Sequence, residues 1–242
     1  NHMADAIEKN IQELEDAARR QEDFTGSFVH ELKTPLTSII GYADMLRSRD
    51  LGEDMRFKAA SYIFSEGKRL ERLSLSLMSL LVVGHSAAEA RTVNMRSLCT
   101  EAVQISRPAM KAKGLSITTR AEEGKLRGDP ALLQTLLQNL LDNARKATDS
   151  GGQVVLVGRR TEEGYQLTVA DQGRGIPAGE LGKITEPFYM VDKSRSRAEG
   201  GAGLGLALCK EIAALHRGSL HFESKEGKGT IVTVTLGGVD DA

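Results

Sequence analysis

The chain has 242 residues, 40% of them hydrophobic, and its 32 lysine and arginine residues nearly balance its 33 aspartate and glutamate residues. This composition is typical of a globular protein with one large or two ordinary domains, and it excludes the positive charge excess of nucleic-acid-binding proteins. The longest apolar run, residues 75–83, is shorter than the ~20 residues that span a bilayer, and Cys99 and Cys209 are the only cysteines. We therefore expect a soluble protein of a reducing compartment that has no disulfide bond and binds no nucleic acid.

The first predicted element is a long helix. From Ala4 to about Ser48, apolar residues recur at intervals of three and four with almost no glycine or turn cluster. The preceding residues 1–3 are interpreted as a remnant of a removed tag, so a sensor or membrane anchor is expected upstream of this sequence. Any contact with a membrane would be made through that absent segment.

Within this helix, a titratable imidazole and a carboxylate are adjacent at His30 and Glu31. His30 lies off the apolar stripe that is expected to form the buried face, which consists of Phe28, Leu32, Leu36, Ile39, Ala43 and Leu46. The His30 ring should therefore point to solvent. An exposed imidazole beside a carboxylate is compatible with a nucleophile, and also with an ordinary surface histidine.

A second predicted helix follows the short polar turn 48–52. Its apolar residues recur at sevens, fours and threes, at Ile63, Leu70, Leu73, Leu77 and Leu80. We expect an antiparallel hairpin over residues 4–88. Two helices cannot enclose a core, and Phe64, Met78 and Leu81 lie outside the seam, so we predict a homodimer in which two hairpins form a four-helix bundle.

Residues 84–91 change in composition and indicate a linker to a second domain, assigned to residues 89–242. Helix and strand patterns alternate there, and short glycine-containing turns favour antiparallel hairpins. The predicted helices are 95–113, 130–148 and 204–217, and the predicted strands are 115–120, 153–160, 165–170, 219–224 and 230–236. The fold class is therefore multidomain, an all-α hairpin followed by an α+β two-layer sandwich with helices on one face.

The predicted helix from Pro130 has an apolar and a polar face, and the polar face carries Thr135, Asn139, Asp142, Asn143 and Lys146. Asparagine is a poor helix former, so Asn139 and Asn143 in a leucine-rich helix need an explanation. Oxygen ligands for magnesium and phosphate are one explanation, and a hydrated surface is the other. Lys146 either meets a phosphate charge or stays in solvent.

A second polar motif, Asp171-Gln-Gly-Arg-Gly175, follows the strand 165–170. A carboxylate at this strand end can accept a hydrogen bond from the exocyclic amine of adenine, and glycines let the backbone approach a flat base. The same glycines, with Asp192 downstream, also match the dinucleotide-binding fingerprint. That fingerprint opens a long helix, whereas Pro177 and a short polar segment follow here, so adenine recognition is favoured.

A third motif, Gly200 to Gly205, leads into an apolar helix, so that backbone amides and a helix N-terminus converge where an anion could bind. The preceding stretch contains Lys193, Arg195 and Arg197 and has the composition of a mobile lid over a triphosphate. The phosphate-binding sequence GxxxxGK[ST] occurs nowhere in the chain. An ATP site must therefore have another architecture.

Taken in order, five motifs resemble the H, N, G1, F and G2 boxes of bacterial sensor histidine kinases, namely His30-Glu-Leu-Lys-Thr-Pro, Asn139-Leu-Leu-Asp-Asn143-Ala, Asp171-x-Gly173-x-Gly175-Ile, Glu186-Pro-Phe188 and Gly201-x-Gly203-Leu-Gly205. The resemblance covers nearly the whole chain after residue 20. It implies a dimerisation and histidine-phosphotransfer hairpin followed by a catalytic ATP-binding domain of the Bergerat type.

By this resemblance His30 is the phospho-acceptor, and Glu31 is the base that takes or orients the ring proton while the other nitrogen attacks the γ-phosphorus. Thr34 shares the helix face of His30, which suits its family role of positioning water when phosphate is removed from the response regulator. Pro35 is expected to bend the helix beside the acceptor.

The resemblance also implies that ATP and Mg²⁺ are the cofactors. Asn143 is the expected magnesium ligand, Asn139 supports the metal and the phosphates, and Asp171 binds the adenine amine. Lys146 belongs to the same nucleotide site, and Phe188 is expected to help the lid dock on the hairpin. The pocket and the lid are shaped by Gly173, Gly175, Gly201, Gly203 and Gly205.

The implied function is ATP-dependent autophosphorylation of His30, followed by transfer to an aspartate in the receiver domain of a response regulator, with phosphatase activity toward that regulator. The implied location is the cytoplasmic part of a membrane-anchored sensor. The chain departs from the family at Ala147, where an aromatic residue is usual, and at Ala202, where threonine is common. Neither change removes a charge or a metal ligand, so activity is expected.

Competing functions fit the sequence less well. Related ATPases of the gyrase and Hsp90 type use a glutamate where this chain has Asn139 to activate water, which argues against hydrolysis. A protein serine kinase with the same pocket would not need the His30 hairpin. A non-enzymatic dimeric scaffold would not need intact box residues.

Overall fold

A computed structural model of the chain describes residues 2–48, 50–83, 90–192 and 201–237. These residues form two compact units. The first is the helical part of the chain up to Ser74, and the second contains most of the chain after it. The residues expected to form the interdomain linker lie mostly outside the described ranges.

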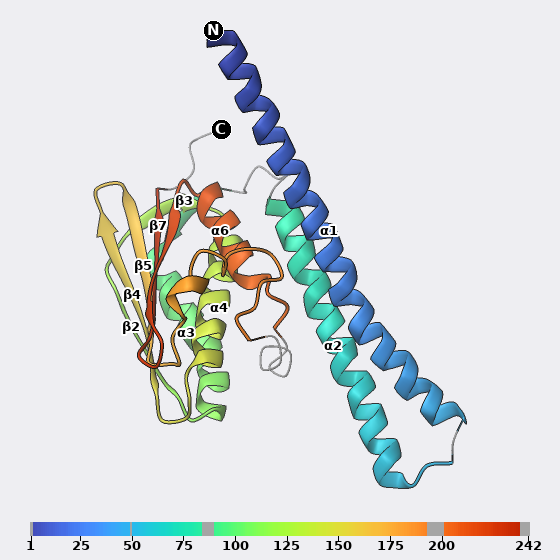
Figure 1. Cartoon of the computed structure of the whole chain (residues 1–242). Coiled ribbons are helices and arrows are strands. Elements are labelled where there is room, and N and C mark those ends of the chain that lie inside the picture. The colour runs from blue at the N-terminus through green and yellow to red at the C-terminus, as the bar shows by residue number, and fades with distance from the viewer. Residues whose placement is uncertain (1, 49, 84–89, 193–200, 238–242) are drawn as a thin grey trace. The chain divides into compact units, whose positions relative to one another are not determined.

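The first unit contains α1 (His2–Ser48) and most of α2 (Glu53–Val83), two long helices that run antiparallel (Figure 1). The predicted hairpin is therefore confirmed. The helix α1 continues through Pro35 without interruption. Leu73, which the spacing of α2 placed in the seam, is 1% exposed.

The buried face of α1 differs from the predicted one. Leu36 of the predicted stripe is 45% exposed, whereas Glu31 and Pro35 are the buried residues among the described side chains of this helix. The predicted stripe is correct only in part: Phe28, Leu32, Ile39 and Leu46 are half-buried, whereas Leu36 and Ala43 are exposed. Three-and-four spacing locates apolar residues without showing which neighbouring helix covers them.

The second unit combines two sheets with helices. Its elements in chain order are β1 (Arg91–Asn94), α3 (Met95–Ala112), β2 (Ser116–Ala121), β3 (Lys125–Gly128), α4 (Pro130–Ala147), β4 (Gln153–Thr161), β5 (Gly164–Asp171), the short 3₁₀ helix η1 (Ala178–Glu180), α6 (Gly205–Leu215), β6 (Ser219–Lys225) and β7 (Gly229–Leu236). These boundaries agree closely with the predicted helices and strands.

The larger sheet has the strand order β2-β4-β5-β7-β6. The pairs β4 with β5 and β6 with β7 are antiparallel hairpins, as predicted, and β5 also pairs antiparallel with β7. The edge strand β2 runs parallel to β4, which the sequence did not indicate. A separate antiparallel pair, β1 with β3, was also not predicted.

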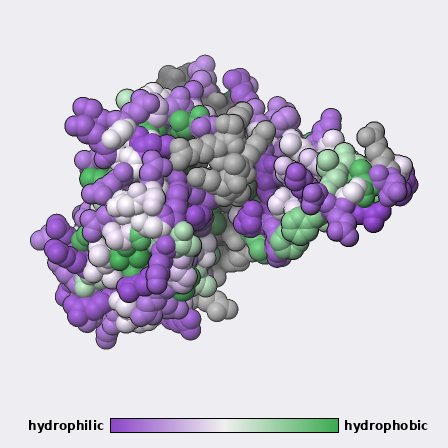
Figure 2. Space-filling model, turned by 90° about the horizontal axis from the view of Figure 1, so that it is seen from below, coloured by the Kyte–Doolittle hydropathy of each residue, from purple (hydrophilic) through white to green (hydrophobic). Residues whose placement is uncertain are grey.

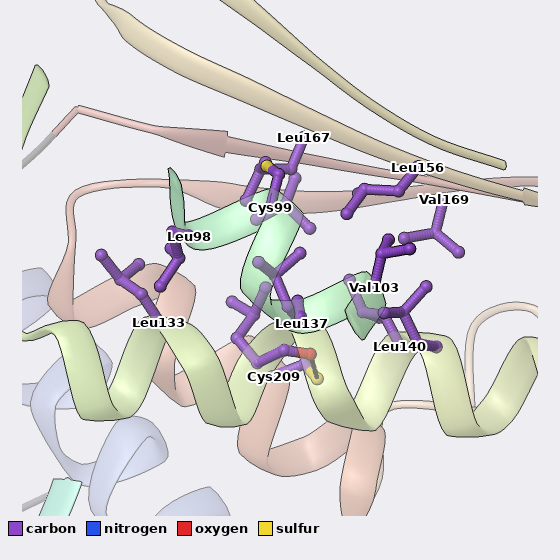
Figure 3. Packing of buried hydrophobic residues seen from close by; sticks show 14 of the residues in the cluster. Leu98, Cys99, Val103, Leu133, Leu137, Leu140, Leu156, Leu167, Val169 and Cys209 are labelled. Carbon is purple, nitrogen blue, oxygen red and sulfur yellow. Dashed lines mark hydrogen bonds between the residues drawn. The ribbon is translucent and has the colours of Figure 1, made fainter. Parts of the chain in front are cut away.

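The helices α3, α4 and α6 cover one face of the larger sheet (Figure 1). Between the helices and the sheet lies a continuous apolar core, in which Leu137 and Leu140 of α4 and Val103 of α3 face Leu156 and Val169 of the sheet (Figure 3). The predicted two-layer α+β sandwich is therefore confirmed. Both cysteines are buried in this unit as free thiols.

The surface is largely hydrophilic but carries apolar patches (Figure 2). On the helical hairpin the large exposed apolar residues include Ile40, Phe57 and Phe64, which are 64%, 75% and 68% exposed. Among the described helices, none is both long enough and apolar enough to cross a bilayer.

Candidate functional site

The helix α4 presents a half-buried polar face opposite its leucines. Its N-terminus is capped by Asp129, whose Oδ1 accepts hydrogen bonds from the backbone N–H groups of Ala131 (2.8 Å) and Leu132 (3.1 Å). Asn139 and Asn143 are half-buried and one turn apart on this helix. The leucines of α4 are therefore buried in the core and its polar face stays half-exposed, as the amphipathic pattern of the sequence predicted.

The first asparagine of this face lies against the start of α6. Asn139 Nδ2 donates a hydrogen bond to Thr135 O at 2.9 Å. A Cβ atom at Gly205 would lie 2.9 Å from Asn139 Oδ1, so glycine permits the close approach of α6 to α4. The side-chain oxygen of Asn139 and the N-terminus of α6 consequently lie next to each other.

Lys146 pairs with a carboxylate of its own helix, whereas the resemblance implies a phosphate as its partner. Its Nζ lies 2.8 Å from Asp142 Oδ2, and Arg145 Nη2 lies 2.7 Å from Asp142 Oδ1. Burial disfavours the charged form of Asp142, but the two cations outweigh burial and lower the pKa of its carboxyl. In this structure Lys146 therefore belongs to an ion pair on α4, and a phosphate would have to compete with Asp142 for it.

Asp171 is the last residue of β5 and is half-buried. Its Oδ1 accepts hydrogen bonds from the backbone N–H groups of Gly173 (2.8 Å) and Thr230 (3.3 Å). Burial raises the pKa of this carboxyl, and the two hydrogen bonds offset only part of that effect. Within the described part of the chain Oδ2 accepts no hydrogen bond, so this oxygen can accept a ligand N–H.

The loop after Asp171 requires its glycines. Gly175 has a φ of 68°, and a Cβ atom there would lie 2.1 Å from Lys225 O. At Gly173 a Cβ atom would lie 2.6 Å from Ala147 O, the last residue of α4. The loop therefore packs against the C-terminal end of the helix that carries Asn139 and Asn143.

Residues of the last hairpin brace this loop, and sequence reasoning missed them. Ile176 N donates a hydrogen bond to Ser224 Oγ at 2.8 Å, and Ser224 Oγ lies 2.9 Å from Thr230 Oγ1. Nothing in the local sequence around Ser224 indicates this role. Only the pairing of β5 with β7 brings these residues to Asp171.

The glycine segment before α6 contacts the Phe188 region. Phe188 is buried, has a φ of 64°, and its backbone N–H donates to Gly203 O at 2.8 Å. Gly203 has a φ of 70°, and a Cβ atom there would lie 2.6 Å from the Phe188 carbonyl carbon. Gly201 is half-buried. The cationic residues of the expected lid, 193–197, lie outside the described residues.

The dinucleotide-binding alternative is wrong. The fingerprint needs a long helix after a strand of a parallel βαβ unit. Here β5 pairs antiparallel with both neighbours, and Gly175 is followed by the three-residue helix η1.

In the first unit His30 is exposed, as predicted from its position off the apolar stripe. Within the described residues the His30 ring makes no hydrogen bond or ion pair. Thr34 Oγ1 donates to His30 O at 3.3 Å, which places both residues on the same side of α1. The ring is thus open to an incoming group.

Glu31 is placed differently from its neighbour. Its Oε2 accepts a hydrogen bond from Arg69 Nη2 of α2 at 2.7 Å, and both side chains are 7% exposed. Arg69 could not be found from the sequence. It lies 38 residues after Glu31, and only the register of the two helices brings the two side chains together.

The side chains of the polar face suit only one kind of metal site. In the described ranges no three His, Cys, Asp or Glu side chains come together. Asparagine oxygens such as those of Asn139 and Asn143 fit a magnesium ion, which takes few protein ligands and keeps phosphate and water oxygens for the rest of its shell.

Two family models match the chain. The model of the His Kinase A (phospho-acceptor) domain matches residues 20–80, and the model of the histidine kinase-, DNA gyrase B- and HSP90-like ATPase matches residues 128–238. The first range contains His30, and the second contains Asn139, Asp171 and Gly205.

Individual proteins agree with these models. The chain is 32% identical to the circadian input-output histidine kinase CikA of Thermosynechococcus vestitus over 100% of this chain and 34% of CikA. It is 34% identical to the sensor-like histidine kinase SenX3 of Mycolicibacterium smegmatis over 91% of this chain and 58% of SenX3. It thus spans between 34% and 58% of the length of these two relatives.

A solved structure shares the fold. The histidine kinase ThkA, in complex with the response regulator protein TrrA, has a TM-score of 0.71 to this structure at 21% sequence identity. The similarity covers 93% of this chain and 65% of the ThkA chain.

Proposed function

Because this chain belongs to the bacterial sensor histidine kinases, whose two core domains it carries in order, we propose that it phosphorylates itself on His30 with ATP. The phosphoryl group then passes to an aspartate of a response regulator. The observation that carries this proposal is the exposed His30 ring, which makes no hydrogen bond in the described part of the chain and lies within the phospho-acceptor match.

The second unit supplies the nucleotide site. The free Oδ2 of Asp171 accepts the exocyclic amine of adenine, which discriminates against guanine because its carbonyl would face the carboxylate. Gly173 and Gly175 let the backbone approach the base, while Asn139 and the N-terminus of α6 lie where phosphates are expected. Asn139 and Asn143 would hold Mg²⁺, which when bound neutralises charge on the phosphates.

In the proposed reaction the γ-phosphoryl group moves from ATP to His30. One ring nitrogen of His30 forms a bond to the γ-phosphorus, and the bond from that phosphorus to the β–γ bridging oxygen breaks, so ADP leaves with the electron pair. The proton on the other ring nitrogen passes to a base. We assign this base to Glu31, which requires its carboxylate to leave Arg69.

Further proposals concern Thr34, the two domains and the location of the protein in the cell. Thr34, beside His30, would position water when the response regulator is dephosphorylated. We propose a hairpin domain at residues 4–88 that forms homodimers, and a catalytic domain at residues 89–242. We also propose that the chain acts in the cytoplasm as the core of a longer sensor, since it matches only part of its relatives.

The alternatives are not favoured. A hydrolytic ATPase of the related clamp type needs a glutamate at the position of Asn139, and amides do not act as general bases. A protein serine kinase leaves the match of residues 20–80 unexplained.

The proposal is tested by incubating the chain with γ-labelled ATP and magnesium. We expect a label that is lost in acid and retained in base, because a phosphorus–nitrogen bond to imidazole hydrolyses when protonated. His30→Gln should abolish labelling with ATP binding unchanged, and Asn143→Ala should abolish labelling with dimerisation unchanged. Undiminished labelling of His30→Gln would refute the acceptor assignment, and undiminished labelling of Asn143→Ala would refute the magnesium assignment.

A further inference from the structure

Asp142 lies on the polar face of α4 and pairs with two cations of the same helix. Its Oδ2 lies 2.8 Å from Lys146 Nζ, and its Oδ1 accepts hydrogen bonds from Arg145 Nε at 3.0 Å and from Arg145 Nη2 at 2.7 Å. The Asp142 side chain is 45% exposed, and those of Arg145 and Lys146 are 26% and 20% exposed. Each carboxylate oxygen therefore has a cationic partner of its own.

The two cations lie on different sides of the helix. At about 100° per residue, Lys146 lies within about 20° of Asn139 around the α4 axis, whereas Arg145 lies on the other side of Asp142. Lys146 also follows Asn143 by one turn. Of these two cations, Lys146 is therefore the one placed to meet the phosphates of a nucleotide bound along Asn139 and Asn143.

The ion pair with Lys146 can break without stranding the carboxylate. If Lys146 Nζ moved to a phosphate oxygen, Asp142 would keep both hydrogen bonds from Arg145 and would not become an uncompensated charge. Because the Asp142 side chain is almost half exposed, water can solvate the released Oδ2. A lysine suits such an exchange, since it carries a compact charge on a flexible stem.

We infer that Asp142 sets the affinity for ATP by competing with its phosphates for Lys146. The inference rests on the proposed nucleotide site and adds a residue that weakens binding there. In the free chain Lys146 is paired with Asp142, so an ATP molecule that uses Lys146 must first break that pair. Asp142 is thus a positioning residue, which acts through Lys146 and needs no contact of its own with the nucleotide.

The test measures the dissociation constant of magnesium ATP for the full chain by isothermal titration calorimetry. Asp142→Asn should lower this constant by about two- to fivefold, the size expected for an ion pair with this exposure. Asp142→Glu keeps a carboxylate four residues before Lys146 and should return the constant toward that of the parent. Adenosine, which has no phosphate, should bind equally to the parent and to Asp142→Asn.

A double-mutant cycle shows whether the effect passes through Lys146. Lys146→Met should weaken ATP binding by itself, and adding Asp142→Asn should then leave the dissociation constant unchanged, because Lys146 is no longer there to be released. A general effect of the Asp142 charge, or of the released Arg145, would persist in that background. Glu123→Gln removes a carboxylate from an exposed ion pair with Arg96 in the same unit, 64% and 51% exposed, and should leave ATP affinity unchanged.

The inference is overturned if Asp142→Asn binds ATP no more tightly than the parent, if its effect persists without Lys146, or if adenosine binding changes as much as ATP binding. Should Asp142→Asn fail to fold in a thermal melt, Asp142→Ser decides in its place by the same criteria. Failure of the proposed function has a different signature: the parent chain would bind no ATP, or would bind it and carry no label on His30.

Discussion

At the level of single residues, the carboxyl of Asp171, which we propose binds adenine, lowers the stability of the folded chain. Burial raises the pKa of its carboxyl in the folded chain. Above both the folded and the unfolded pKa the carboxyl is ionised in either state, so the folded state bears the cost of burying a charge. Below both values the group is neutral in either state and the cost disappears.

Asp171→Asn should therefore raise the melting temperature at neutral pH while weakening ATP binding. The amide oxygen can still accept from Gly173 N and Thr230 N, but the amide group facing adenine can present a donor to the amine. The gain in melting temperature should shrink as the pH falls through the carboxyl's titration range. Calorimetric melts from pH 4 to 8 and nucleotide titrations measure the two effects.

Asp142→Asn is the matched control, since that carboxyl has the opposite shift. Its pKa is lowered because Lys146 and Arg145 outweigh burial, so its stabilising effect is present at neutral pH and lost as the pH falls through the folded pKa. This variant should lower the melting temperature at pH 7. A lower melting temperature for Asp171→Asn at the same pH would contradict the reasoning for both residues.

Residues named from sequence differ in how well their surroundings could be predicted. Asp171 and Gly175 followed from their place at the end of a strand, because a local motif sets their conformation. The partners of Lys146 and Glu31 did not follow. A lysine four residues after an aspartate can pair with it or reach a ligand, and Arg69 meets Glu31 only through the register of two helices.

At the level of elements, α4 links the core to the proposed nucleotide site. Its leucines pack against the sheet, its polar face carries Asn139 and Asn143, and its end contacts the loop after Asp171. Asp129 begins this helix by accepting two backbone hydrogen bonds. The buried His216 of the α6 C-terminus accepts a third, from Asp129 N at 3.1 Å, through Nε2.

Asp129→Ala should lower the free energy of unfolding by about 1 kcal/mol, the usual cost of losing an N-cap. The asparagines lie more than two turns from the cap, so ATP affinity should change little. Denaturant unfolding and nucleotide titration of the same preparation measure both quantities.

Asp129→Asn, which keeps a side-chain acceptor, should be close to the parent in stability. If instead both variants lost ATP affinity without losing stability, the N-terminus of α4 would be part of the nucleotide site.

The elements that were predicted correctly from the sequence are those that short stretches of the chain specify. Long periodic helices and strand pairs joined by short turns are specified locally, as α4 and the β4–β5 hairpin show. The strands β1 and β3 have four residues each and pair across the whole of α3 and β2. Such short, non-local pairing leaves little trace in a pattern of alternation, and the parallel pairing of β2 with β4 leaves none.

At the level of the whole molecule, the helical hairpin exposes more apolar surface than a monomer needs. Phe57 and Phe64 are seven residues apart on α2 and are 75% and 68% exposed, so both lie on one stripe of the helix. Burying such a stripe between two hairpins would complete the core that two helices cannot build.

Replacing both Phe57 and Phe64 by serine should raise the dimer dissociation constant by about tenfold or more, since each buried phenylalanine contributes roughly 1.5–3 kcal/mol. Sedimentation velocity over a concentration series measures the change. Ile105→Ser, on α3 of the other unit and 54% exposed, should leave the dimer intact. A parent chain that sediments as a monomer at all concentrations would refute the four-helix bundle.

The contacts that brace the Asp171 loop determine when, during its own synthesis, the protein becomes competent. Ile176 N donates to Ser224 Oγ and Thr230 N donates to Asp171 Oδ1, so the loop depends on β6 and β7, which follow it in the chain. The hairpin with His30 emerges before these strands and can fold before them. A growing chain therefore displays the proposed acceptor before the loop proposed to bind ATP is braced, and the proposed self-phosphorylation has to wait until β7 has been synthesised.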